Sequence, residues 1–236
     1  ILFVLNIPVI VRILMSSKLI HSNPQNMNTS LRPPQRGRFI TFEGTEGGGK
    51  STQIALVKSA LEALGLEVIV TREPGGTELS EKIRDLLLTE EMHENTELLL
   101  MFAARSEHVE KVIKPALSAG KWVLSDRFTE SSYAYQGYGR GVDLDKIAQL
   151  ERLVQGTLRP DITFWFDLPI EMGMKRVRRR AASDRFEQEQ MAFFERVVSG
   201  FAQLAKARPE QFVRIDAKQS IEELNQNIMA EIERRL

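Results

Sequence analysis

The chain has 236 residues, of which 42% are hydrophobic and 27% are charged, and its 32 basic residues balance its 32 acidic ones. This size and composition suit one sizeable α/β domain or two small ones, and the absence of excess positive charge argues against DNA or RNA as the main partner. The chain contains no cysteine, which excludes disulfides, thiolate zinc sites and a thiol nucleophile and is compatible with a reducing cytoplasm.

The N-terminal segment, residues 1–36, differs in composition from the rest. It begins without Met, is mostly apolar as far as Arg12, and then turns polar. The apolar run is too short to span a bilayer, contains Pro8 and has no clear small-residue cleavage site, so neither a membrane anchor nor a signal peptide is favoured. We expect residues 1–36 to be a disordered or non-native leader, whose first part is upstream sequence translated ahead of a natural start at Met27, and residues 37–236 to form a single domain with no membrane partner.

Short apolar runs alternate with helical patterns from residue 38 onward. The pattern predicts strands over 38–44, 67–71, 121–126, 161–167 and 211–216. It predicts helices over 51–64, 78–89 and 96–119, a long helical region over 170–207 that is interrupted near 181–184, and a last helix opened by a capping box of Ser220 and Glu223. Because each parallel return needs a crossover, the alternation predicts an α/β fold with a five-stranded parallel sheet flanked by helices on both faces.

A glycine-rich loop follows the first predicted strand and precedes a helix. Gly44, Gly49, Lys50 and Ser51 fit the pattern G-x-x-x-x-G-K-[ST] in the strand–helix context that this phosphate-binding loop requires. Backbone N–H groups of such a loop wrap the β-phosphate, the lysine bridges β- and γ-oxygens, and the serine hydroxyl ligates Mg²⁺. The residues expected to bind ATP are Gly44, Thr45, Glu46, Gly47, Gly48, Gly49, Lys50, Ser51 and Thr52.

Other motifs choose among the P-loop classes. The chain has no N-K-x-D tetrapeptide, which a GTPase needs for guanine, and its third predicted strand ends in Asp126-Arg127 rather than in an Asp-Glu pair. An aspartate at this place can hold Mg²⁺, and an adjacent arginine can bind a second phosphate through two donors. This pair therefore indicates phosphoryl transfer between two phosphate-bearing ligands. A basic run over 175–180 precedes the predicted helix interruption and is a candidate lid over the phosphates.

The motifs together resemble those of the bacterial thymidylate kinases over about residues 37–236. The P-loop is followed in the family's order and spacing by TREPGGT (71–77), DRFTESSYAYQGYGRG (126–141), RPDITFWFDLP (159–169) and DRFEQE (184–189). The resemblance implies a P-loop nucleoside-monophosphate-kinase fold with a small basic lid near 176–186. It also implies transfer of the γ-phosphate of ATP to thymidine 5′-monophosphate (dTMP) with Mg²⁺, for dTTP synthesis, by a cytoplasmic homodimer.

The resemblance assigns roles around the acceptor's phosphate and sugar. Arg127 and Arg72 are expected to hold the acceptor phosphate, and Asp126, with Ser51, the metal or its waters. Glu46 is expected to face the 3′-hydroxyl. Tyr135 is expected under the deoxyribose, where its bulk disfavours a 2′-hydroxyl.

The base pocket is assigned in the same way. Ser132 and Gln136 are expected to bond the pyrimidine edge, and Arg105 to donate to a base carbonyl. In many relatives the stacking aromatic precedes this arginine by four positions, where this chain has Met101. We expect Phe102, three positions before Arg105, to stack on the base with Met101 beside it.

Catalysis is assigned to Lys50, Asp126, Arg127 and arginines of the lid. One subgroup of these kinases places a catalytic arginine where this chain has Gly47, so the transition-state charge is expected to be met by the lid, with Arg180 and Arg185 closest to the helix interruption. Two alternatives stay open, a deoxynucleoside kinase and a non-catalytic nucleotide-binding regulator. The acceptor-side arginines disfavour the first, and the intact P-loop disfavours the second.

Overall fold

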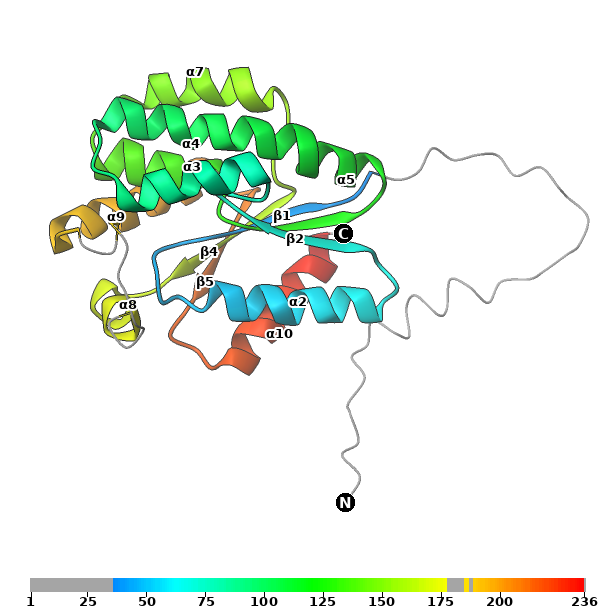
Figure 1. Cartoon of the computed structure of the whole chain (residues 1–236). Helices are drawn as coiled ribbons and strands as arrows, with labels where there is room; N and C mark the ends of the chain where they lie inside the picture. Colours follow the sequence, from blue (N-terminus) through cyan, green and yellow to red (C-terminus); the bar gives the residue numbers. More distant parts are fainter. Residues whose placement is uncertain (1–35, 178–184, 187–188, 236) are drawn as a thin grey trace, which may run out of the picture.

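The structure, a computed structural model, describes residues 36–177, 185–186 and 189–235 (Figure 1). Most of the leader and most of the lid, including Arg180, therefore lie outside the described residues. Within these ranges, no helix combines the length and the apolar character needed to cross a membrane.

The described residues contain the predicted five-stranded parallel sheet. Its strands are β1 (Phe39–Glu43), β2 (Val68–Arg72), β3 (Trp122–Asp126), β4 (Ile162–Asp167) and β5 (Phe212–Asp216), in the order β2-β3-β1-β4-β5. All five residues of β1 are buried, because a central parallel strand is covered on both faces. Phe42 pairs with Asp126 and Glu43 with Trp165, so the carboxyl ends of the three central strands lie side by side.

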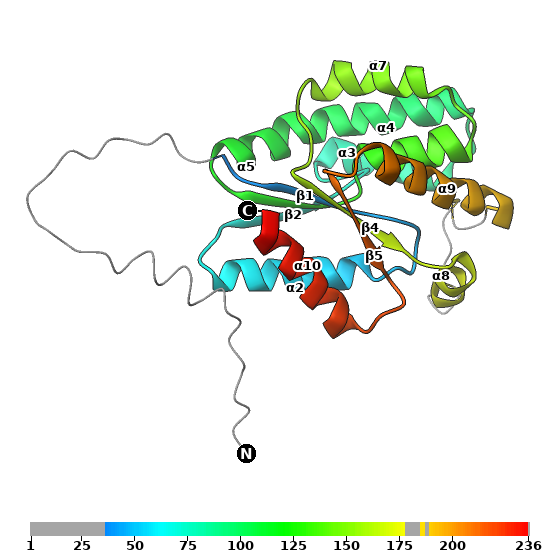
Figure 2. The same cartoon turned by 180° about the vertical axis from the view of Figure 1, so that it is seen from behind.

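Helices cover both faces of the sheet (Figures 1 and 2). On one face, α2 (Lys50–Ala63) lies beside α10 (Ile221–Arg235), and Ser220 and Glu223 form the predicted capping box at the start of α10. The helical segments of the other face and of the sheet's end are α3 (Glu78–Thr89), α4 (Glu94–His108), η1 (Val109–Ile113), α5 (Lys114–Ser118), α6 (Thr129–Ser132), η2 (Tyr133–Gly139), α7 (Leu144–Gln155), α8 (Ile170–Val177) and α9 (Met191–Ala207). The layers are those predicted.

Two hydrophobic clusters fix the layers. One joins Ile40, Phe42 and Phe164 of the sheet to α2 and α10. The other packs Tyr135 of η2 against Phe193 and Phe201 of α9. The second cluster holds η2 in place, and η2 carries several of the expected substrate-binding residues.

The structure differs from the sequence-based prediction in the segment from 129 to 155. This segment was not assigned a helix, yet it forms α6, η2 and α7. The glycines of η2 interrupt its helical pattern but permit close packing: a Cβ at Gly137 would lie 2.6 Å from Leu144 Cδ2, and one at Gly139 would lie 2.6 Å from Phe193 Cε2. The predicted helix 96–119 is continuous but contains the π-helical turn η1 just before Pro115.

Candidate active site

The P-loop, residues 44–52, joins the carboxyl end of β1 to the N-terminus of α2. Gly44 has φ of 130°, and a Cβ there would lie 2.6 Å from the carbonyl oxygen of Phe166, so only glycine fits this position. Lys50 is 7% exposed, and its Nζ donates to the carbonyl oxygens of Gly44 (3.0 Å) and Thr45 (2.9 Å). Burial and the nearby Arg127 lower the pKa of Lys50. An anion bound between Lys50 and Arg127 would therefore stabilise the charged forms of both side chains.

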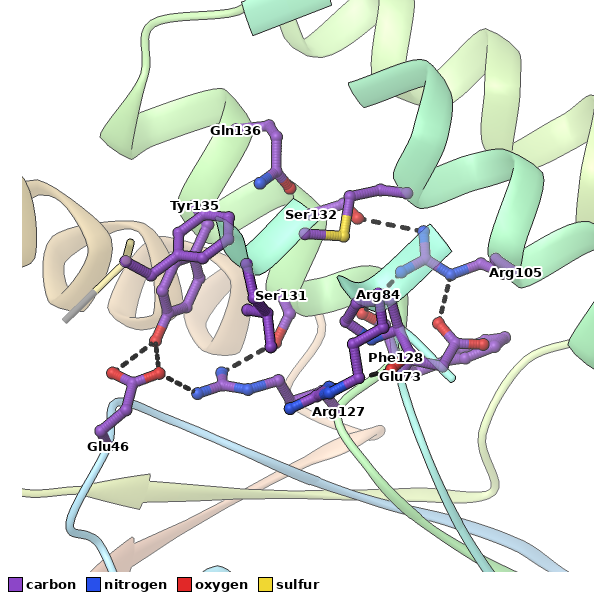
Figure 3. Close-up of a pocket in the computed structure, with 14 residues that line it drawn as sticks. Glu46, Glu73, Arg84, Arg105, Arg127, Phe128, Ser131, Ser132, Tyr135 and Gln136 are labelled. Atoms are coloured by element: carbon purple, nitrogen blue, oxygen red, sulfur yellow. Dashed lines mark hydrogen bonds and ion pairs between the residues drawn. The ribbon is translucent and has the colours of Figure 1, made fainter. Parts of the chain in front are cut away.

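Two cavities adjoin at this end of the sheet. The first, here called the P-loop cavity, is lined by Glu46, Gly47, Gly48, Gly49, Lys50, Ser51, Thr52, Arg72, Glu73, Arg84, Asp126 and Arg127. The second, here called the inner cavity, is lined by Glu46, Glu73, Pro74, Arg84, Leu88, Met101, Arg105, Arg127, Phe128, Ser131, Ser132, Tyr135, Gln136 and Phe186 (Figure 3). Glu46, Glu73, Arg84 and Arg127 line both, so ligands in the two cavities would meet at these side chains.

Arg127 lies at the junction of the two cavities. Its φ of 71° is unusual for a residue with a side chain, and its N–H donates to the carbonyl oxygen of Phe42 at 3.0 Å. The guanidinium donates to Gly44 O (3.0 Å) and to Glu46 Oε1 (2.5 Å). Burial alone would lower the pKa of Arg127, but the surrounding acidic groups raise it, so the side chain carries its positive charge at any working pH.

Glu46 and Tyr135 form a second polar contact at the junction. The Tyr135 hydroxyl lies 3.1 Å from both carboxylate oxygens of Glu46, and the Arg127 guanidinium lies over the Tyr135 ring at 4.9 Å (Figure 3). The tyrosine is 5% exposed, and burial raises its pKa, which keeps the phenol protonated and able to donate. Tyr135 and Glu46 both line the inner cavity and contact each other there, although they are 89 residues apart in the chain.

Glu43, the last residue of β1, holds the segment around Arg127 in place through hydrogen bonds. Glu43 was not identified as a site residue from the sequence. Its Oε1 accepts from Phe128 N (2.7 Å), and its Oε2 lies 2.5 Å from Ser131 Oγ. Ser131 Oγ also lies 3.2 Å from Arg127 Nη1. Burial and the neighbouring Glu130 raise the pKa of Glu43 from 4.5 to about 8. Glu43 could have been identified from the sequence because a carboxyl group at the buried end of a central strand is unusual.

Arg105 reaches the inner cavity from α4. It is 3% exposed and donates through Nε to Glu73 Oε2 (2.6 Å), through Nη1 to Ser132 Oγ (3.0 Å) and through Nη2 to Phe128 O (3.1 Å) (Figure 3). Burial opposes the charge of Glu73, but Arg105 and His108 outweigh it and lower the pKa of Glu73. The guanidinium is therefore held at three points, and within the described part of the chain each terminal nitrogen keeps one further N–H to donate.

The structure separates Met101 from Phe102. Met101 lines the inner cavity, whereas Phe102 is 2% exposed and is not among the lining residues. Successive residues of a helix point about 100° apart, so only one of the two faces the cavity. The Arg105 guanidinium lies over the Phe102 ring at 4.6 Å; Phe102 thus supports Arg105 from behind, and the expected stacking of Phe102 on a base does not fit this placement.

Other expected residues divide between the cavities and their surroundings. Ser51, Asp126 and Arg72 line the P-loop cavity, although the Arg72 side chain is 55% exposed and pairs with Glu81 at 2.7 Å. Ser132 and Gln136 line the inner cavity as expected. Arg84, which sequence reasoning missed, lines both cavities and donates to Pro74 O at 2.9 Å. Arg84 lies within α3, ten residues after Pro74, and matches no sequence motif by which it could have been found.

Arg185 contacts α3 and α4 rather than lining either cavity. It is not among the lining residues of either, and its guanidinium donates to Glu97 Oε2 (2.6 Å) and to Leu87 O (3.1 Å). Arg180 lies outside the described residues. Arg176 at the base of the lid donates to Gly47 O at 2.9 Å, so α8 places one arginine against the P-loop.

A P-loop at the carboxyl edge of a parallel sheet, with a second cavity joined to it by arginines, defines a P-loop kinase of the nucleoside-monophosphate-kinase fold. The family model of thymidylate kinase matches residues 42–228. The chain is 56% identical to the thymidylate kinase of Alkalilimnicola ehrlichii over 191 residues, which cover 79% of this chain and 88% of the relative.

Two further comparisons agree. The chain is 50% identical to the thymidylate kinase of Teredinibacter turnerae, covering 84% of this chain and 98% of the relative. Its structure matches the crystal structure of thymidylate kinase from Ehrlichia chaffeensis with a TM-score of 0.69 and 36% identity, covering 84% and 99% of the two chains. The chain belongs to the thymidylate kinase family.

Proposed function

We propose that the chain transfers the γ-phosphate of ATP to dTMP, giving thymidine 5′-diphosphate and ADP. The observation that carries this proposal is the junction of the P-loop cavity and the inner cavity at Arg127 and Arg84. A donor held by the P-loop and an acceptor held in the inner cavity would bring their phosphates together between these arginines. Family membership supplies the identity of the acceptor.

Donor binding rests on the P-loop. Backbone N–H groups at the start of α2 and the Lys50 ammonium would hold the β- and γ-phosphates. The Lys50 Nζ contacts with Gly44 O and Thr45 O hold the ammonium at the mouth of the loop. Arg176 adds a positive charge beside Gly47. Arg180 remains our candidate among the lid arginines beyond the described residues.

Acceptor binding rests on the inner cavity. Arg127, with Arg84 and Arg72 nearby, would hold the acceptor phosphate in line with the donor. Tyr135 would pack under the deoxyribose, and Glu46 would accept from the 3′-hydroxyl. No side-chain nucleophile is needed, because the acceptor's phosphate oxygen attacks and is already largely ionised near neutral pH.

The base end of the inner cavity offers donors and an acceptor to thymine. Arg105 has N–H groups without a partner among the described residues that could donate to the O4 carbonyl, and Ser132 and Gln136 line the same cavity. Met101 faces the cavity and would pack against the base. Phe102 would act indirectly, by supporting the Arg105 guanidinium.

The residues near the P-loop fit a magnesium ion. Asp126 Oδ1 is buried and has no hydrogen-bond partner among the described residues, and both Asp126 and Ser51 line the P-loop cavity. Oxygen donors of this kind suit Mg²⁺ when phosphate oxygens and water complete its shell. When bound, the ion would neutralise charge on the β- and γ-phosphates. Ser51 and Asp126 would hold it directly or through water.

Three further expectations rest on the family resemblance. We propose that residues 37–236 form the working kinase domain, that it acts as a homodimer, and that it works in the cytoplasm. Light scattering after size-exclusion chromatography tests the dimer.

The role of Arg127 is tested by Arg127→Ala. Loss of an arginine that binds a phosphate through charged hydrogen bonds is expected to lower kcat/KM for dTMP by roughly 100-fold or more. Arg234→Ala is the matched control, since Arg234 is an exposed arginine of α10 that pairs only with Glu231 among the described residues. Similar small losses in both variants would contradict the assignment.

A further inference from the structure

A buried carboxylate that the transfer reaction does not use directly lies behind Gln136, a residue that lines the inner cavity. Glu97 of α4 is 1% exposed. Its Oε1 accepts from Gln136 Nε2 (2.8 Å) and Arg140 Nε (3.4 Å), and its Oε2 accepts from Arg185 Nη2 (2.6 Å). Glu97 therefore joins η2, which lines the cavity, to Arg185 at the end of the expected lid segment.

The contact with Gln136 decides which end of the glutamine amide faces the cavity. A carboxylate flanked by two guanidinium groups only accepts hydrogen bonds, so the amide must turn its NH₂ toward Glu97. The Gln136 Oε1 then remains at the cavity, where it has no hydrogen-bond partner among the described residues. Figure 3 shows Gln136 at the cavity, near Ser132 and Tyr135. The amide thus offers an acceptor to the ligand.

This orientation matches one kind of pyrimidine. Thymine and uracil present an N3–H donor beside the O4 acceptor, whereas cytosine presents an N3 acceptor beside an N4 amino donor. Gln136 Oε1 would accept from N3–H while Arg105 donates to O4. Cytosine would place an acceptor against Oε1 and an amino group against the guanidinium. A reversed Gln136 amide would remove the first of these two mismatches.

We propose that Glu97 is a positioning residue that fixes the Gln136 amide and thereby sets the preference of the enzyme for thymine over cytosine. The inference rests on the proposed function. A glutamine at position 97 could donate to Gln136 Oε1, which would free the Gln136 NH₂ to face the cavity. Glu97→Gln would then weaken the match to N3–H and relax the rejection of cytosine.

The test measures kcat/KM for dTMP, dUMP and dCMP by ADP release in wild type and Glu97→Gln. An unmatched buried hydrogen bond predicts a loss of roughly 10- to 100-fold for dTMP. dUMP is expected to lose the same factor, since it shares N3–H and O4, while the dTMP/dCMP ratio falls by about 10-fold or more. A selectivity ratio unchanged from wild type would overturn the inference. Failure of the wild type to use dTMP would instead overturn the proposed function.

Two further variants separate positioning from stability. Arg140→Gln removes one guanidinium from Glu97 but leaves the carboxylate to Gln136, so the dTMP/dCMP ratio is expected to stay within about 3-fold of wild type. In a Gln136→Ala background, Glu97→Gln is expected to cause no further change in the ratio, because residues that act through one contact are not additive. An equal shift in Arg140→Gln, or a full further shift in the double variant, would contradict the role. If Glu97→Gln does not fold, the double variant E97Q/R140Q, which removes one negative and one positive charge, is compared with Arg140→Gln by the same dTMP/dCMP ratio.

Discussion

Glu43 makes stability depend on pH in the direction opposite to that of most carboxylates. Burial and Glu130 raise the pKa of Glu43 from 4.5 to about 8, against the lowering effect of Ser131 and Arg127. Between these two values the folded chain keeps a proton that the unfolded chain has released, so the free energy of unfolding falls as pH rises. The contribution is fully present below pH 4.5 and is lost as pH rises through about 8. At about 1.4 kcal/mol per pKa unit, the whole shift corresponds to roughly 5 kcal/mol.

The perturbation is Glu43→Gln. A glutamine has nearly the same shape, can accept from Phe128 N, and can place its NH₂ group against Ser131 Oγ, which accepts when its hydroxyl turns, but it does not ionise. The difference in unfolding free energy, wild type minus variant, is expected to fall by about 1.4 kcal/mol per pH unit between pH 5 and pH 8.

Urea unfolding at several pH values measures this difference. Glu130→Gln is the companion variant, because Glu130 is also buried and burial raises its pKa. Removing its charge is expected to lower the pKa of Glu43 and flatten the dependence. A difference between wild type and Glu43→Gln that stays constant from pH 5 to pH 8 would refute the reasoning.

Two other predictions concern the P-loop and the leader. Gly44→Ala is expected to abolish ATP-dependent turnover, since its Cβ would meet the Phe166 carbonyl at 2.6 Å. Gly65→Ala, where φ is +81° but no atom lies within 4 Å, is expected to cost only about 1 kcal/mol of stability, measured by urea unfolding, with full activity. Deleting residues 1–26 is expected to leave kcat and KM unchanged in a steady-state assay. Loss of activity on that deletion, or retention of activity in Gly44→Ala, would contradict these assignments.

The five strands and the P-loop were predictable because their signals are local. The five strands lie within one or two residues of the predicted ranges, since each is a short apolar run bounded by polar or glycine residues. Lys50 and Ser51 were found from spacing alone, and the Asp126-Arg127 pair from its place at the end of a strand. Each of these signals occupies fewer than ten consecutive residues.

The networks that support the site were not predictable, because they join residues far apart in the chain. Glu43 contacts Ser131, and Glu97 contacts Arg185, across separations of 88 residues each. No local pattern marks such partners. The choice between Met101 and Phe102 could not be made from the sequence for a different reason: helical periodicity places both near Arg105, but only the packed helix shows which one lines the cavity.

The central claim is that the phosphate held by the P-loop goes to the phosphate of a second nucleotide. It is tested most directly by ADP release from the full chain with ATP and Mg²⁺, offering dTMP, thymidine, dUMP or no acceptor in parallel. The account predicts release driven mainly by dTMP, with little release from thymidine or without acceptor. Release without acceptor, or with thymidine alone, would contradict the acceptor role of the inner cavity.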